Sequence, residues 1–145
     1  MSPTVAHDDL VWANGYFFGR PTRYGIMTAQ LKQFIDTSGP LWMQGKLAHK
    51  PVTAFSGAMN LHGRQENTIH STYAVMEHWG TIIVPPGYTD PLLYAAGGNP
   101  YGVSYTAAMG STGVSAEALA AARYMGARLA RYAEVLATNA KRLVP

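Results

Sequence analysis

The chain has 145 residues, of which 48% are hydrophobic, and this length and composition fit a single domain (residues 1–145) with a real core. It contains no cysteine, which excludes disulfides, a thiolate nucleophile and cysteine-ligated metals, and which agrees with a reducing compartment. The net charge of +3 comes without a basic run interleaved with aromatic residues, so nucleic-acid binding is not expected.

Charged residues make up only 13% of the chain, about half the usual share of a soluble domain. Two explanations carry equal weight: other subunits cover part of the surface, or the exterior is rich in Ser, Thr and Asn. Residues 1–15 lack the basic and apolar segments of a signal peptide. No apolar stretch approaches the roughly 20 residues that span a bilayer. The sequence therefore predicts a soluble, cytoplasmic protein without a membrane span.

Short apolar runs alternate with longer helical stretches in the first half of the chain. In chain order they predict a helix end or turn at residues 8–13, a buried strand at 15–18 that Gly19 stops, an amphipathic helix at 26–37, a loop with Trp42 at 41–50, and a strand at 51–55. Gly39 and Pro40 serve as the stop signal of the helix at 26–37.

The second half of the chain continues the alternation of strands and helices and then ends in a long connection and a long helix. It predicts a helix at residues 65–79, a strand at 81–85, a long irregular connection at 86–114, and a long helix at 116–138 that Ser115 caps. A connection of this length without regular structure is uncommon and usually functional.

The order strand, helix, strand, helix, strand, helix predicts a parallel α/β sheet with right-handed crossovers. Because a parallel sheet must be covered on both faces, the two crossover helices should cover one face and the last helix the other. Three strands are too few for such a sheet, so we expect one or two further strands and a helix beyond these elements.

Ligands of an open parallel sheet bind beyond the carboxyl ends of its strands. Three loops follow predicted strands: residues 19–25, residues 56–64, and residues 85–91 with 99–102. The first offers backbone N–H groups, a hydroxyl, a guanidinium and an aromatic ring, which suit a planar, partly anionic ring system. An ordinary strand-to-helix turn explains it equally well. For the second loop, a ligand-binding role and an ordinary surface loop are equally well supported. For the third loop, an ordinary surface connection is favoured over a pocket wall.

The histidines show no metal-ligand spacing, because neither His-x3-His nor His-Glu-x-x-His occurs among positions 7, 49, 62, 70 and 78. We therefore expect no metal site. A Ser-His-Asp hydrolase is not expected either, since the chain lacks a G-x-S-x-G elbow.

Several motifs occur in order and with consistent spacing from about residue 8 to the C-terminal helix. They are Phe18–Gly25, Gln30–Thr37, Gly39–Trp42, Gly45–Leu47, Gln65–Ile69, His78–Gly80, Ile83–Tyr88, Gly98–Gly102 and Ala122–Gly126. This series resembles the tryptophan-repressor-binding-protein (WrbA) type of NAD(P)H:quinone oxidoreductase. The resemblance implies a flavodoxin-like five-stranded parallel sheet with helices on both faces.

The resemblance also implies an activity and a cofactor. Members bind FMN, usually form tetramers, and reduce quinones by two electrons with NADH or NADPH in a ping-pong sequence through the flavin. A homo-oligomer, tetramer or dimer, is therefore expected.

Site residues are implied by position. The first loop would line the isoalloxazine ring and hydrogen-bond its polar edge through Pro21, Thr22, Arg23, Tyr24 and Gly25. The second would flank the other side of the flavin through Ser56, Gly57, Ala58, His62 and Gly63. His78 would be the catalytic residue beside the ring, where nicotinamide and quinone alternate. Trp42 and Tyr88 would form the substrate pocket, with Trp42 helping to wall a neighbouring subunit's site.

The chain departs from the family pattern in three places. It begins near the family's third strand, so the first two strands, the first helix and the phosphate loop are expected to be absent. Arg20 stands where a small residue is usual, and Met59 and Leu61 are bulky for a loop beside a flavin. The altered second loop favours an alternative function, a flavin-free accessory or interaction paralogue that keeps only the oligomer interface. The Pro21–Gly25 loop, His78 and Trp42 favour the quinone oxidoreductase.

Overall fold

The sheet is parallel and centres on one long strand. The computed structural model describes residues 4–107 and 113–143. Its strands are β1 (Tyr16–Pro21), β2 (Pro51–Ala58), β3 (Ile82–Ile83) and β4 (Val103–Thr106). β1 pairs with one edge of β2, while β3 and β4 both pair with its other edge, β3 near the start of β2 and β4 near its end. β3 and β4 therefore act as two pieces of one interrupted strand.

The prediction that Gly19 stops the first strand is wrong, since β1 continues in register with β2 to the pair Pro21 and Gly57. A Cβ at Gly19 would collide with the ring of Phe55, which packs directly over it. Glycine is present at this position because a neighbouring ring needs the space.

The connection predicted to be irregular at residues 86–114 contains the short helix α5 (Leu92–Ala95) and β4. β4 has only four residues, too few for a periodicity to be recognised. Its partner strand lies more than 40 residues earlier in the chain. The sequence pattern therefore did not predict the fourth strand of the sheet.

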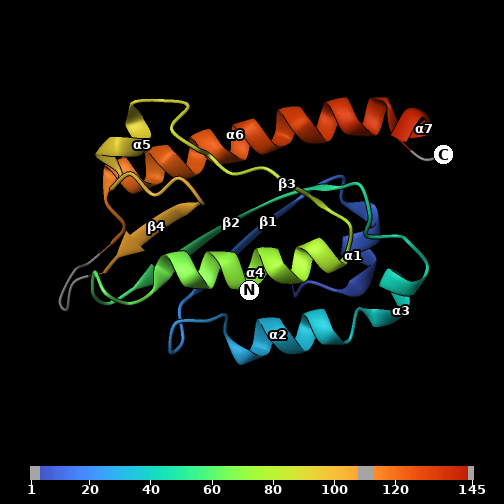
Figure 1. Ribbon diagram of the computed structural model, residues 1–145, viewed down its shortest axis with the longest axis horizontal. Helices are drawn as coiled ribbons and strands as arrows, with labels where there is room; N and C mark the ends of the chain where they lie inside the picture. The colour runs from blue at the N-terminus through green and yellow to red at the C-terminus, as the bar shows by residue number, and fades with distance from the viewer. Residues whose placement is uncertain (1–3, 108–112, 144–145) are drawn as a thin grey trace.

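The helices lie on both faces of the sheet, as predicted (Figure 1). The helices α2 (Ala29–Asp36) and α4 (Gln65–His78) lie on one side, and the long helix α6 (Ala116–Thr138) lies on the other. The remaining helices are short: α1 (His7–Trp12), α3 (Gly39–Met43) and α7 (Ala140–Leu143). The crossover helices thus cover one face and the last long helix covers the other.

Trp42 lies on α3 and not in the loop predicted at residues 41–50. Gly39 and Pro40 begin this helix, whereas the sequence pattern predicted that they end the preceding one. Proline is well suited to the first turn of a helix because its missing N–H needs no partner there. The same dipeptide therefore separates two helices instead of ending one.

Apolar side chains form a separate cluster on each face. Under α2 and α4 the buried members include Leu10, Tyr16, Ile35, Leu47, Val52, Met76 and Trp79. Under α6 they are Leu93, Val103, Ala121 and Met125, with Phe17 packed against them. Alternation along β1 sends Tyr16 and Phe18 to the first cluster and Phe17 to the second.

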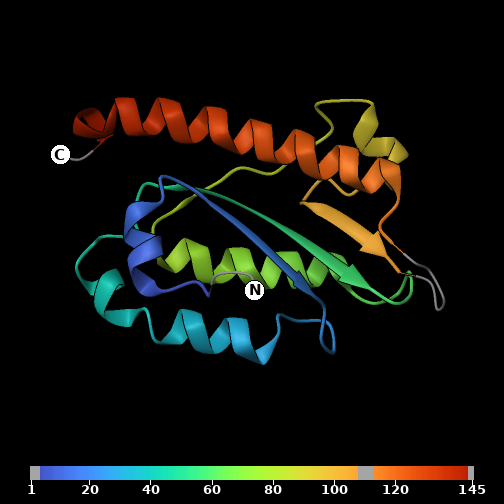
Figure 2. The same cartoon turned by 180° about the vertical axis from the view of Figure 1, so that it is seen from behind.

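The outer edge of β1 pairs with no strand among residues 4–107 and 113–143. Figure 2 shows β1 in front of β2, at the near edge of the sheet. A hollow of about 790 Å³ runs along this edge, lined by residues of α1, β1 and α2. No helix in the described part of the chain is long and apolar enough to cross a membrane.

The hydroxyl of Tyr16 links β1 to α1. Replacing Tyr16 with phenylalanine tests how much this hydroxyl contributes to stability at different pH values. The hydroxyl donates to the Leu10 carbonyl at 2.7 Å, which also accepts from Lys50 Nζ at 2.6 Å. At neutral pH, Tyr16→Phe should lower the free energy of unfolding by about 1 kcal/mol, the usual net value of one hydrogen bond.

The difference should shrink in alkali, because burial raises the pKa of Tyr16 above its ordinary value. Between the unfolded pKa of about 10 and the higher folded pKa, the unfolded chain releases a proton that the folded chain retains. Tyrosine therefore loses about 1.4 kcal/mol of stability per pH unit above pH 10 relative to phenylalanine. Urea titrations of both proteins at pH 7 and pH 11 measure this, and a gap independent of pH would contradict it.

Candidate functional site

The carboxyl ends of three neighbouring strands meet at one end of the sheet. Pro21 of β1 pairs with Gly57 of β2, and Gly57 pairs on its other side with Tyr105 of β4. Beyond them the chain continues into the turn at residues 22–26 and the loop at residues 59–64. The first two predicted loops are therefore adjacent, and Thr22 N–H donates to the Gly57 carbonyl at 2.8 Å.

The turn after β1 is a tight reversal. Arg23 and Ile26 exchange two backbone hydrogen bonds of 2.9 and 3.1 Å, and the two residues between them have left-handed backbones, with φ of 50° at Tyr24 and 84° at Gly25. The Tyr24 side chain is fully exposed. The N–H groups of Tyr24 and Gly25 have no partner among the described residues. This turn therefore presents the Tyr24 ring to solvent, while Gly25 itself is buried.

The first turns of α4 hold both loops in place. Asn67 Nδ2 donates to the Gly25 carbonyl at 2.7 Å, and the hydroxyls of Thr22 and Thr68 are 2.5 Å apart. Gln65 Nε2 donates to the Asn60 carbonyl and to Thr106 Oγ1, which ties the second loop to β4. Sequence reasoning gave these helix residues no role. Their signal was the polar run at residues 65–68, where an amphipathic helix begins.

Arg64, the last residue of the second predicted loop, was not among the predicted site residues. It precedes α4 with a left-handed backbone, φ 62°, which is uncommon for a residue with a side chain. A Cβ on Gly25 would lie 2.7 Å from Cδ of Arg64, so the arginine stem covers this glycine. Arg64 thus places a cation beside the turn, at a position with locally strained backbone.

Arg20 does not contribute to the loop surface. It points under α4, is 5% exposed, and donates through Nη2 to the Thr68 carbonyl at 2.8 Å. Its Nε and Nη1 are buried without a hydrogen-bond partner in the described part of the chain. Burial lowers the pKa of Arg20 to about 10. The ligand-facing part of the first loop therefore begins at Pro21 and Thr22.

The second loop borders two hollows at the carboxyl ends of the strands. One, of about 740 Å³, is lined by His62 and Arg64 together with Tyr105 and Thr106 of β4. The other, of about 460 Å³, is lined by Pro21, Ser56 and Gly57 and by the first turns of α6. The hydroxyl of Ser56 is buried without a partner among the described residues.

The two bulky residues of this loop differ in their relation to the hollows. Leu61, 80% exposed, lines the larger hollow, whereas Met59, 63% exposed, lines neither. Ala58 and Gly63 pack closely, since a Cβ on Gly63 would overlap that of Ala58. The loop is therefore compact near the strands and bulky only at its tip.

His78 lies at the opposite end of the sheet from the turn and the loop. It ends α4, whose 14 residues separate it from the second loop by about 20 Å of helix. Figure 1 shows the end of α4 beside α3, across the molecule from the turn that follows β1. Within one chain, His78 therefore does not join the predicted flavin-lining residues.

The structure does bring His78 together with Trp42. The indole N–H of Trp42 donates to the His78 carbonyl at 2.6 Å, and both side chains are exposed. Tyr88 lies elsewhere, on the α6 side of the sheet. Its ring stacks on that of Tyr94 with centroids 5.0 Å apart, and the adjacent Thr89 bonds to Tyr124 of α6. No group of three potential metal-ligating side chains occurs in the part of the chain that the structure describes.

The comparison with protein families settles the relationship of the chain. The family model described as "NADPH-dependent FMN reductase" matches residues 4–89, which is more than half of the sequence. The chain belongs to this FMN reductase family.

Three curated relatives of this FMN reductase family member carry the same name. "NAD(P)H dehydrogenase (quinone)" of Deinococcus radiodurans is 48% identical over 105 residues, covering 72% of this chain and 52% of that protein. The protein of that name from Chelativorans is 42% identical over 125 residues, covering 81% and 61%. That from Trichlorobacter lovleyi is 40% identical over 134 residues, covering 89% and 66%. The chain thus spans about half to two thirds of the length of these relatives.

A solved structure gives the same relationship in three dimensions. The flavodoxin, WrbA-like protein from Agrobacterium tumefaciens superposes with a TM-score of 0.71 at 27% identity, covering 88% of this chain and 70% of that one. The predicted flavodoxin-like α/β fold and the resemblance to the WrbA type are therefore confirmed.

Proposed function

We propose that the chain is part of an FMN-dependent NAD(P)H:quinone oxidoreductase. The curated relatives bear that name, and the matching family model is that of an FMN reductase. The observation that carries the proposal is the pairing of the turn at residues 22–26 with the second loop at the carboxyl ends of the strands. A ligand at this position fits the general rule for open parallel sheets.

The residues present suit the ring of a flavin. The free N–H group of Tyr24 and the hydroxyl of Thr22 offer hydrogen bonds to a polar ring edge, and the buried Gly25 supplies the left-handed backbone of the turn. Arg23 is exposed beside them and adds a positive charge. Across the turn, Ser56 and Gly57 line one hollow and His62 lines the other. Ala58 and Gly63 complete this wall because their close packing sets the path of the loop.

FMN, when bound, would supply the ping-pong hydride transfer between NADH or NADPH and a quinone. The task of the protein is then to hold the ring and to leave one face open. Met59 and Leu61, which are both largely exposed, would cover the rim of the site.

The substrate side of the site is proposed to come from a second subunit. Trp42 and His78 lie together but about 20 Å of helix away from the flavin-lining loops of their own chain. In a tetramer or dimer, this pair would stand over a neighbour's flavin, where the His78 imidazole would donate a proton to the quinone oxygen. The Tyr88 ring, stacked on Tyr94, would border the same substrate pocket.

The proposal is tested by titrating the chain with FMN, followed by flavin fluorescence, with the mass in solution measured in parallel. Saturable binding and quinone-dependent oxidation of NADH or NADPH are expected. A folded oligomer that binds no FMN would overturn the proposal in favour of the flavin-free interaction paralogue.

Tyr24→Ser probes the ring contact without disturbing the core, because the Tyr24 side chain is fully exposed. We expect FMN to bind about tenfold more weakly, the usual effect of losing an aromatic contact of about 1.4 kcal/mol. Tyr101→Ser is the matched control, since this exposed ring packs against His70 on α4. Equal affinities of the Tyr24 variant and the wild type would place the ring elsewhere.

A further inference from the structure

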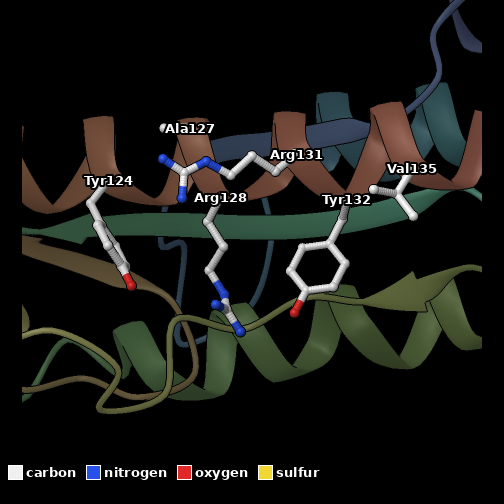
Figure 3. Close-up of a pocket in the computed structure, with 6 residues that line it drawn as sticks. All are labelled: Tyr124, Ala127, Arg128, Arg131, Tyr132 and Val135. Atoms are coloured by element: carbon white, nitrogen blue, oxygen red, sulfur yellow. The ribbon is translucent and has the colours of Figure 1, made fainter.

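A separate hollow lies along the middle and C-terminal half of α6. Its volume is about 360 Å³, near the lower end of the range for small-molecule pockets. It is lined by Tyr124, Ala127, Arg128, Arg131, Tyr132 and Val135. Figure 3 shows the side chains of Tyr124, Arg128 and Tyr132 extending from α6 toward the segment that follows β3. None of these residues belongs to the proposed flavin site.

The pocket holds two cations and no carboxylate. Neither Arg128 nor Arg131 forms an ion pair within residues 4–107 and 113–143, where the ion pair is that of Lys32 with Asp36. Arg131 is exposed, whereas Arg128 is half-buried and its Nε is buried without a hydrogen-bond partner in the same residues. The Arg128 guanidinium therefore has no neighbouring carboxylate in the described part of the chain, and an anion that reaches its Nη groups from the pocket would be stabilised.

Two aromatic rings hold fixed positions at the ends of the pocket. The Arg128 guanidinium lies 5.2 Å from the centroid of the Tyr132 ring, a cation–π contact that restrains both side chains. At the other end, the Tyr124 hydroxyl is 2.8 Å from Thr89 Oγ1, which restrains the second ring. Val135 adds an apolar wall. A ligand here would meet ring faces as well as charge.

We propose that this pocket binds a small aromatic anion, a single ring that bears a carboxylate or phosphate group. The acid group accepts N–H bonds from the Arg128 guanidinium, which matches planar oxyanions, and Arg131 adds a second positive charge to the same pocket. The ring lies against Tyr132 and Val135. A bare inorganic anion would use the charge but leave the rings and the apolar wall without contact, and the volume suits one ring with its acid group.

Calorimetric titration of the full chain tests this with four probes: 4-hydroxybenzoate, phenyl phosphate, cyclohexanecarboxylate and inorganic phosphate. The first two should bind with Kd below about 1 mM, and the two probes without an aromatic ring should bind about tenfold more weakly or not at all. Comparing 4-hydroxybenzoate with phenyl phosphate shows which acid group the pocket prefers.

Variants assign the binding to the pocket. Arg128→Gln and Arg131→Gln should each weaken the aromatic anions about tenfold. Arg123→Gln, at an exposed position on the same helix outside the pocket, should change Kd less than about twofold. If Arg128→Gln unfolds, as circular dichroism would show, the exposed Arg131 variant decides the question.

Three results would overturn the proposal. The first is the absence of saturation by either aromatic anion below about 10 mM. The second is inorganic phosphate binding as tightly as phenyl phosphate, or equal weakening by Arg123→Gln, because either would indicate charge attraction alone. The third is a change of molecular mass in Arg131→Gln together with no binding by the wild type, which would make the pocket a subunit contact.

Discussion

Replacing Gly102 with alanine is expected to lower the free energy of unfolding by about 2–4 kcal/mol, the range of an overpacked core position. Gly102 is buried directly before β4. A Cβ there would overlap the Ala54 carbonyl oxygen of β2 and lie 3.0 Å from Cδ1 of Ile69 on α4. The overlap is with backbone, so no side chain can rotate away, and β4 must move off β2.

The effect should extend to the flavin loops, because β4 is tied to the second loop through Gln65 and Thr106. Gly39→Ala is the matched control: this glycine begins α3, and a Cβ added to it would meet nothing within 4 Å. It should leave stability unchanged or raise it by up to about 1 kcal/mol. Urea denaturation of the two variants separates packing from a general effect of losing glycine. Equal stabilities would show that β4 is not held at the distance that the structure gives.

The long elements could be predicted from the sequence because their signals are local. The helix expected at residues 116–138 has those bounds, with Ser115 Oγ accepting from Ala118 N–H at 3.2 Å. The helix expected at residues 65–79 ends one residue earlier, at His78. The strand at 51–55 lies within β2, which continues to Ala58. Repeated periodicity and a capping residue were sufficient for these elements.

The elements that were missed depend on contacts between distant residues. β4 exists because it pairs with β2, and β1 extends past Gly19 because Phe55 fills the space of the absent side chain. The direction of Arg20 follows from the alternation of side chains along that extension, which places it under α4 with Tyr16 and Phe18. A residue assigned to a loop was therefore a buried strand residue.

The candidate site also has a part that the sequence predicts and a part that depends on contacts between distant residues. The neighbouring positions of the first and second loops follow from the parallel topology that the sequence predicted. The separation of His78 from these loops follows from it too, because a helix after a parallel strand returns to the opposite end of the sheet. Only the contacts across the site, such as Arg64 over Gly25 and Asn67 to the Gly25 carbonyl, needed the structure.

The separation of His78 from the flavin loops of its own chain can be tested by mutation. If the proposed function holds, His78→Ala should lower quinone-reductase turnover about a hundredfold, the lower range for loss of a positioned acid–base group. Stability should stay unchanged, because the imidazole is exposed and the contact with Trp42 uses the backbone carbonyl. FMN affinity should also be kept. His70→Ala, an exposed histidine two turns earlier on α4, is the control and should retain wild-type turnover.

Mixing two inactive variants then shows whether the site is shared between subunits. Gly25→Val strains a left-handed position and collides with Arg64, so it should abolish flavin binding in its own chain. Equal amounts of this variant and His78→Ala, refolded together, should recover about a quarter of wild-type activity, since half of the loops and half of the histidines are intact and combine at random between subunits. Mixing assembled proteins without refolding provides the blank. No recovery in the mixed oligomer would place His78 and the flavin loop of one chain in the same site, which the 14-residue length of α4 makes incompatible with this fold.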